Sequence, residues 1–221
     1  MIALSLTLGC SALKANSLTS GVEDGPNRDL MKAVIAGDQS AMDNALRQGA
    51  DPNFGVPNPD YPDIDKVYVL ELAYENYPES TAYLRTLLEA GADPDLPVTE
   101  EDNTLLFKPL SDTYLEHIKL LIEYGADVNY RNTEYNSTAL RRMLTSRSHA
   151  AATVMIEAGA DPTLEDKFGK SLMSALDTIK EIQITKENDI IARYSSADFW
   201  KLIDALRDKG YIDPNDPFWQ R

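Results

Sequence analysis

The chain has few of the side chains from which most active sites and metal centres are built. Cys10 is its only cysteine, and His117 and His149 are its only histidines. One cysteine cannot form an intrachain disulfide, and the two histidines do not have the spacing of a metal-binding pair. A phosphate-binding glycine loop and a Gly-x-Ser-x-Gly turn are also missing. We therefore expect no enzyme activity, no catalytic residue, no bound metal and no cofactor.

Positive charge is scarce as well. The 21 Lys and Arg residues are outnumbered by 36 Asp and Glu residues, which gives a formal net charge of −15. Such a surface repels phosphate backbones and anionic lipid headgroups, so nucleic acid is excluded as the expected partner. The charge favours a protein partner with a basic or mixed surface, or serves only to keep the chain in solution.

The longest apolar stretch near the start, residues 2–8, is too short to cross a bilayer as a helix. It matches the apolar core of a secretory signal. The Thr-Leu-Gly-Cys sequence that ends at Cys10 resembles the lipobox of bacterial lipoproteins, although Thr stands at the Leu position and Leu at the small-residue position. We expect residues 1–15 to form a signal or lipoprotein segment with Cys10 lipidated; cleavage near Ala15 and a chain that is not exported are the alternatives. Residues 16–26 are polar and are expected to form a tether.

A repeated turn sequence runs through the rest of the chain. Gly-Ala-Asp-Pro-Asn, or a close variant of it, begins at Gly49, Gly91, Gly125 and Gly159, and the glycines are separated by 42, 34 and 34 residues. A fifth copy, with one extra residue, begins at Gly210. Glycine accepts the left-handed backbone conformation that ends a helix, and Asp and Pro favour a turn after it. The pattern predicts a helix that ends at each of these glycines.

Apolar residues precede each glycine at helical spacing. Four residues before it the chain has Ala45, Leu87, Leu121, Met155 and Leu206. Nineteen residues before the first four glycines it has Leu30, Leu72, Leu106 and Leu140. Ser, Thr, Asp and Asn residues of the kind that start helices stand just before several of these apolar runs, in the openings Asn27-Arg-Asp-Leu30, Asn103-Thr-Leu-Leu106, Ser137-Thr-Ala-Leu140 and Lys170-Ser-Leu172. Each unit is therefore predicted to contain a short first helix, a loop, a second helix and the glycine turn.

These units resemble ankyrin repeats, whose period is about 33 residues. The resemblance covers residues 27–215 and implies an all-α fold, an ankyrin-repeat solenoid of about five helix-turn-helix units within a domain at 27–221. The Thr-Pro-Leu-His opening of the family is nowhere intact, which leaves the repeat boundaries open by a few residues. A generic helical repeat of another type is the alternative.

Two insertions interrupt the period. The first lies within residues 55–65, where three prolines exclude a helix and predict an extended loop. The second lies between Ala175 and Ala197 and is expected to lengthen a helix or add a loop.

Ankyrin repeats generally bind proteins through the tips of their turns and through the concave face formed by the first helices. Applied to this chain, the resemblance implies a protein-binding site at the tips, where aromatic and acidic side chains gather. The candidates are Tyr61, Asp63, Asp65, Tyr68, Glu100, Glu101, Asp102, Tyr130, Tyr135 and Phe168. The alternative is that these are solvated loops whose tyrosines fold against the repeats. On the concave side, the weaker candidates are Tyr74, Asn76, Arg141 and Arg142.

An exported ankyrin protein resembles small envelope proteins that bacteria pair with secreted toxins. The implied function is that of a non-enzymatic immunity protein, in the periplasm or anchored by lipid at the outer membrane, that inhibits a phospholipase-type toxin. Membrane contact is expected only through a lipid anchor at Cys10. A general periplasmic adaptor or stress-accessory protein is the first alternative, and a secreted effector directed at a host is the second. Fold alone does not decide among them.

Overall fold

The computed structural model describes residues 18–58, 66–99, 101–108, 112–185 and 196–220, and the chain divides into two compact units, residues 1–100 and 101–221. The structure is 53% helical and 4% strand, which confirms a mostly helical fold. The predicted signal segment with Cys10 lies outside the described residues. Within the predicted tether, Leu18 and Thr19 are buried. In the part of the chain that the structure describes, no helix combines the length and apolar character needed to cross a membrane.

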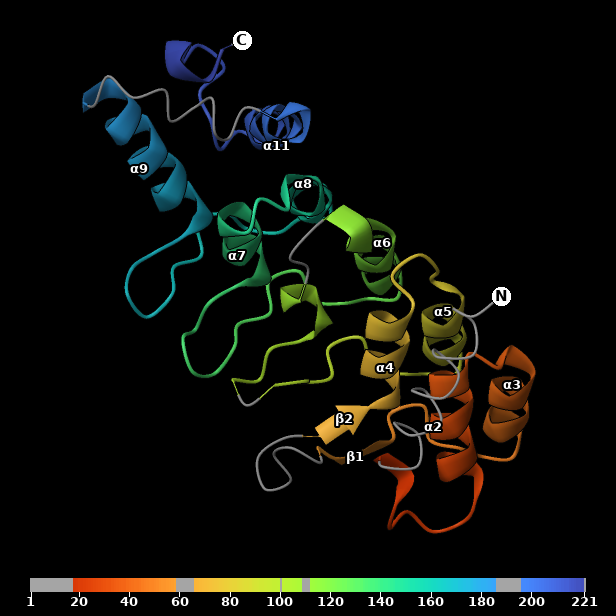
Figure 1. Cartoon of the computed structure of the whole chain (residues 1–221). Helices are drawn as coiled ribbons and strands as arrows, with labels where there is room; N and C mark the ends of the chain where they lie inside the picture. The colour runs from red at the N-terminus through yellow and green to blue at the C-terminus, as the bar shows by residue number, and fades with distance from the viewer. Residues whose placement is uncertain (1–17, 59–65, 100, 109–111, 186–195, 221) are drawn as a thin grey trace, which may run out of the picture. The chain divides into compact units, whose positions relative to one another are not determined.

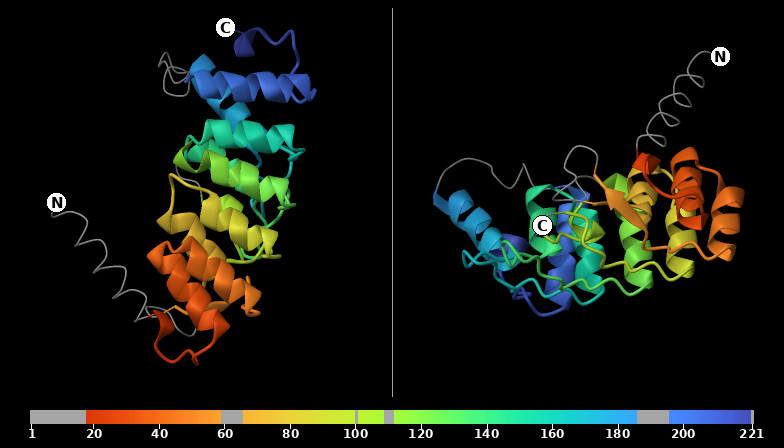
Figure 2. Two further views of the ribbon diagram at one scale, coloured as in Figure 1. Left: turned by 90° about the vertical axis from the view of Figure 1, so that its right-hand side faces the viewer. Right: turned by 90° about the horizontal axis from the view of Figure 1, so that it is seen from below.

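The described residues of the first unit form two pairs of helices (Figure 1). The first pair is α2 (Pro26–Ala36) and α3 (Gln39–Arg47), and the second is α4 (Val69–Asn76) and α5 (Ala82–Glu89). Helix α2 packs against both α3 and α4, and α4 packs against α5, as Figures 1 and 2 show. Two tyrosines tie the pairs together, because the Tyr77 hydroxyl donates to the Val34 carbonyl oxygen at 2.6 Å and the Tyr83 hydroxyl to that of Gly37 at 2.8 Å.

Helices also dominate the described part of the second unit. These are α6 (Leu115–Glu123), α7 (Ala139–Thr145), α8 (His149–Glu157), α9 (Leu172–Thr185) and α11 (Ala197–Asp208). Single 3-10 turns are formed by η1 (Leu105–Phe107), η2 (Asp112–Tyr114) and η3 (Pro217–Trp219). Helix α8 packs against α6, α7 and α11, and α7 packs against η1 and α9 (Figure 1).

All five predicted glycine turns have equivalent backbone geometry. Gly49, Gly91, Gly125, Gly159 and Gly210 have φ angles of 91°, 95°, 93°, 99° and 81°. Each glycine N–H bonds to the carbonyl three residues earlier, and the next N–H bonds to the carbonyl five residues earlier, as at Ala126 and Leu121 with 3.0 Å. The residues four positions before the glycines are at most 1% exposed. The predicted helix ends and apolar stripes are therefore confirmed.

The aspartate of each turn holds the turn closed. Its Oδ1 accepts the backbone N–H two residues later, for example at 2.9 Å from Asn53 to Asp51 and at 2.8 Å from Asn129 to Asp127. In the fifth copy Asp213 does the same for Asn215. In that copy Tyr211 takes the alanine's position in the hydrogen-bond pattern, and the residue after it, Ile212, is only 5% exposed.

An asparagine of one turn then bonds to the next turn along the chain. Asn53 Oδ1 accepts the Asp93 N–H at 2.8 Å in the first unit, and Asn129 Oδ1 accepts the Asp161 N–H at 2.8 Å in the second. Asn27, which we expected among the helix-starting residues, instead accepts the Asp51 N–H at 2.7 Å from within α2. Within each unit, one pair of successive turns is thus joined by a side-chain to backbone hydrogen bond.

Two local predictions need correction, and a third is tested only in part. The segment around Leu106 was expected to be a short helix, but it forms only the 3-10 turn η1, because Pro109 has no N–H with which to extend the helical hydrogen bonds. The insertion at 55–65 was expected to be an extended loop; it begins with the strand β1 (Gly55–Pro57), which pairs antiparallel with β2 (Lys66–Tyr68) directly after the insertion, and residues 59–65 lie outside the described residues. Of the helix-starting residues, Ser171 does accept the Ser174 N–H at the start of α9, but Thr138 forms no side-chain cap on α7.

Candidate functional site

The loops at 101–103, 131–137 and 165–170 of the second unit lie against one another, and we call them the tip surface. Two of the loops need unusual backbone conformations, since Asp102 and Asn136 have φ angles of 56° and 52°. Asn and Asp tolerate this left-handed region better than most residues. The sequence therefore places suitable residues where these loops reverse direction.

The first two loops are joined by polar side chains. The Thr133 hydroxyl donates to Asp102 at 2.6 Å, and Asn132 Nδ2 donates to Asn103 Oδ1 at 3.1 Å. Asn103 in turn donates to Glu101 at 3.1 Å. Because Asn103 and Asn132 are buried, these bonds satisfy groups that would otherwise be costly to remove from water. The loops are held as one layer.

Asp166 organises the third loop. Its side chain is only 2% exposed, and Oδ1 accepts the N–H groups of Phe168 at 2.8 Å and Lys170 at 3.0 Å. Its other oxygen pairs with the guanidinium of Arg141 on α7 at 2.8 Å. A buried carboxylate is tolerated when it is paired and hydrogen-bonded in this way. One residue therefore fixes both the loop and the direction of Arg141.

Two aromatic rings project from the tip surface. Phe168 is 65% exposed and Tyr135 is 38% exposed. The Lys167 ammonium lies 4.5 Å from the centre of the Tyr135 ring and 5.3 Å from that of Phe168, and the Lys167 N–H donates to the Tyr135 carbonyl at 2.8 Å. A hydrogen bond to Glu134, together with that carboxylate's charge, raises the pKa of the Tyr135 hydroxyl, so it remains a proton donor at neutral pH. Exposed rings held by a cation are suited to contact with a protein.

A hollow of about 430 Å³ opens beside these rings. Its charged lining consists of Glu101 and Asp166 with Arg141 and Arg142, so carboxylates and guanidinium groups balance. Arg142 is exposed and makes no ion pair within the described residues, whereas Arg141 is held by Asp166. The hollow thus offers aromatic, polar and cationic groups at one place.

The structure brings together some of the predicted site residues and not others. Glu101, Asp102, Tyr135 and Phe168 belong to the tip surface, and Tyr130 is half-buried with its ring at 85° to that of Phe107. Tyr68 belongs to the first unit, in β2, where its ring covers Gly55; a Cβ at Gly55 would come within 2.5 Å of it. Tyr74, expected on the concave side, is instead buried. The predicted residues outside the described part of the chain are Tyr61, Asp63, Asp65 and Glu100.

Two contributors to the tip surface have roles that the sequence does not predict. Asp166 belongs to the loop tips where acidic side chains gather, but it is buried and organises the third loop. Lys167 was not singled out, although it holds both exposed rings. The signal for Asp166 was present in the Asp-Lys-Phe-Gly sequence, because Asp followed three residues later by Gly is typical of a tight turn.

The two histidines are packed into the helical core. His149 Nδ1 lies 3.3 Å from the Ser196 hydroxyl and its ring packs edge-on against Phe199, while burial lowers its pKa. His117 is buried in α6. Within the described ranges, no group of three His, Cys, Asp or Glu side chains has the geometry to hold a metal ion. No known family model matches the chain, and no curated protein matches it.

Proposed function

We propose that the chain is an ankyrin-repeat protein that works by binding another protein and catalyses no reaction. The repeated geometry supports the family: five glycine turns share one hydrogen-bond pattern, each follows a helix, and in each unit an asparagine bonds one turn to the next. Repeats of this kind present rows of loops on a stacked helical core, a surface suited to protein recognition.

One observation carries the proposed binding role. Phe168 and Tyr135 stay exposed on loops that are otherwise fixed by buried polar groups. Large exposed rings on a preorganised surface lose little conformational freedom on binding and are enriched among the residues that dominate interface energies. Tyr61, Asp63, Asp65 and Glu100 remain proposed contributors from the sequence.

The proposed place of action is the bacterial envelope, with Cys10 lipidated, and the proposed partner is a secreted toxin that the chain inhibits as an immunity protein. The apolar run at residues 2–8, the cysteine that follows it and the net charge of −15 support this proposal. The acidic surface would speed encounter with a toxin whose surface is basic or mixed.

Mass spectrometry of the protein purified from its native cells, together with whatever co-purifies, tests both parts. We expect a diacylglyceryl-modified mature chain that begins at Cys10, and one protein recovered in stoichiometric amount. Tyr135→Ser should weaken recovery of that protein at least fivefold, since a tyrosine at the centre of an interface contributes about 1 kcal/mol or more to the free energy of binding. Tyr211→Ser is the matched control, because Tyr211 is equally 38% exposed but lies outside the tip surface.

Equal loss of the partner in both variants would remove the tip surface from the interface. For inhibition, cells that produce the co-purified protein in their periplasm should survive only when this chain is present. Survival that does not depend on the chain would refute the immunity function and leave an adaptor function in its place.

A further inference from the structure

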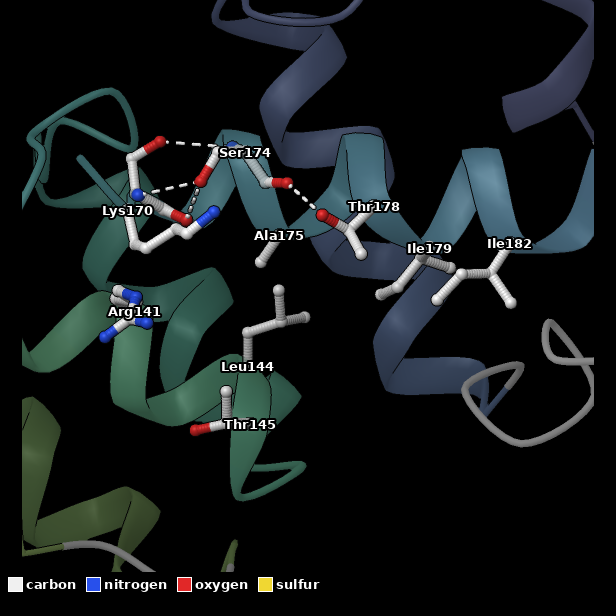
Figure 3. Close-up of a pocket in the computed structure, with 10 residues that line it drawn as sticks. Arg141, Leu144, Thr145, Lys170, Ser174, Ala175, Thr178, Ile179 and Ile182 are labelled. Atoms are coloured by element: carbon white, nitrogen blue, oxygen red, sulfur yellow. Dashed lines mark hydrogen bonds between the residues drawn. The ribbon is translucent and has the colours of Figure 1, made fainter. Parts of the chain in front are cut away.

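A groove of about 360 Å³ runs between α7 and α9 of the second unit (Figure 3). Leu144 of α7 and Ala175, Ile179 and Ile182 of α9 form its aliphatic part, and Ser and Thr side chains of both helices complete the lining. Figure 3 shows Arg141 and Lys170 together at one end and Ile182 at the other. The groove thus has cationic groups at one end and aliphatic and hydroxyl-bearing side chains along the rest.

The side chains at this end of the groove are positively charged, whereas the chain as a whole is negatively charged. Arg141 and Lys170 are the only charged residues in the described lining, and no carboxylate lines the groove, although the chain as a whole carries −15. Lys170 is exposed and forms no ion pair within the described residues. Asp166 binds one guanidinium nitrogen of Arg141, and a guanidinium carries further N–H donors.

We propose that this groove receives a segment of the partner protein that carries an Asp or Glu side chain next to aliphatic side chains. The carboxylate lies at Lys170 and Arg141, and the aliphatic side chains lie along Leu144, Ile179 and Ile182. Charge complementarity selects this occupant. Lys170 has no ion pair within the described residues, so a basic segment would be repelled by it and an uncharged one would leave it without a counter-charge. Arg141 is already paired with Asp166 and contributes its remaining N–H donors. The proposal rests on the proposed protein-binding function and specifies the chemistry that the partner presents.

The arrangement of Arg141 favours recognition of a carboxylate. Because Asp166 is buried and bonded to two backbone N–H groups, it holds the guanidinium in one place before a ligand arrives. A fixed guanidinium loses less conformational entropy on binding than a free one. Lys170 then supplies the positive charge that neutralises the partner's carboxylate.

The test is selection of short random peptides displayed on phage against the full mature chain, followed by affinity measurements. We expect the selected peptides to contain Asp or Glu within four residues of Leu, Ile or Val. For the best synthetic peptide, Lys170→Gln should weaken binding about threefold to tenfold, and a Glu→Gln change in the peptide should do the same. The two changes made together should cost little more than either alone, because both remove one interaction.

Two further variants complete the design. Ile182→Ala should weaken binding by about tenfold through lost aliphatic contact. Lys119→Gln on α6, which removes an exposed lysine that does not line the groove, should leave the affinity unchanged. Circular dichroism of each variant checks that folding is intact.

Selected peptides without an acidic residue, or an affinity that is indifferent to Lys170→Gln, would overturn the proposal. So would dimerisation of the chain that Ile182→Ala abolishes, since the occupant would then be a second copy. A co-purified protein that is lost with Tyr135→Ser but unaffected by Lys170→Gln and Ile182→Ala would sink this proposal while the protein-binding function stands. If acidic-aliphatic peptides bind the groove but no protein co-purifies from the native cells, the groove proposal stands and the proposed partner is refuted.

Discussion

The asparagine that links two turns should make a measurable contribution to stability. In the second unit, Asn129 accepts the Asp161 N–H at 2.8 Å and donates to the Gly159 carbonyl at 3.3 Å. Asn129→Ala removes both bonds and leaves the Asp161 N–H without its protein acceptor. The backbone of neighbouring turns then keeps its own bonds but loses the link between them.

The magnitude follows from the two bonds. A typical hydrogen bond contributes about 0.5–1.5 kcal/mol net to folding. The bond to Asp161 is short and the one to Gly159 is long, and both sites are partly open to water, so we expect a loss of about 1–2 kcal/mol in the free energy of unfolding. For a chain of this size that corresponds to a decrease in Tm of about 2–8 °C.

Asn215→Ala provides the matched control. Asn215 occupies the corresponding place in the fifth turn and is exposed, and its side chain makes no hydrogen bond within the described residues. Its replacement should change the free energy of unfolding by no more than about 0.5 kcal/mol. Urea denaturation followed by circular dichroism measures both variants. If the two variants lose equal stability, the link between turns does not contribute and the reasoning is refuted.

Two other predictions concern the core and the response to acid. Leu121 has no exposed surface, so Leu121→Asp should unfold the unit that contains it, whereas Lys119→Asp at an exposed position of the same helix should leave the circular dichroism spectrum unchanged. Burial lowers the pKa of His149 below its ordinary 6.5, so the unfolded chain binds this proton more readily and the free energy of unfolding should decrease as the pH falls through 6.5. Denaturation at a series of pH values should show a shallower decrease in His149→Gln; an identical decrease would contradict this cause.

The helix ends could be predicted from the sequence because each rests on a local rule. A glycine that needs a left-handed φ, followed by Asp and Pro, specifies its turn without reference to the rest of the chain. The 3-10 turn at Leu105 was missed because the apolar spacing there matched a helix. That spacing takes no account of Pro109, which has no N–H with which to extend the helix. The strand pair was missed because its register depends on Tyr68 covering Gly55, a contact between residues on different strands.

The candidate site was less accessible to sequence reasoning. Aromatic and acidic residues mark the tips, and Tyr135 and Phe168 do remain exposed there. Whether an acid is solvated or buried depends on which side chain comes close in space, and nothing in the spacing of Arg141 and Asp166 indicates their ion pair. The groove between α7 and α9 arises only when two helices from different repeats pack together.

Asp166 determines both the conformation of a loop and the direction of a neighbouring cationic side chain. Because the same carboxylate closes a loop and aims Arg141, any replacement at this position changes the loop and the arginine together. Phe168, Lys167 and Arg142 project from that framework, and their side chains supply no hydrogen bond to it within the described residues. New specificity can therefore evolve by exchange of these outer side chains, one at a time, on an inherited scaffold that does not change.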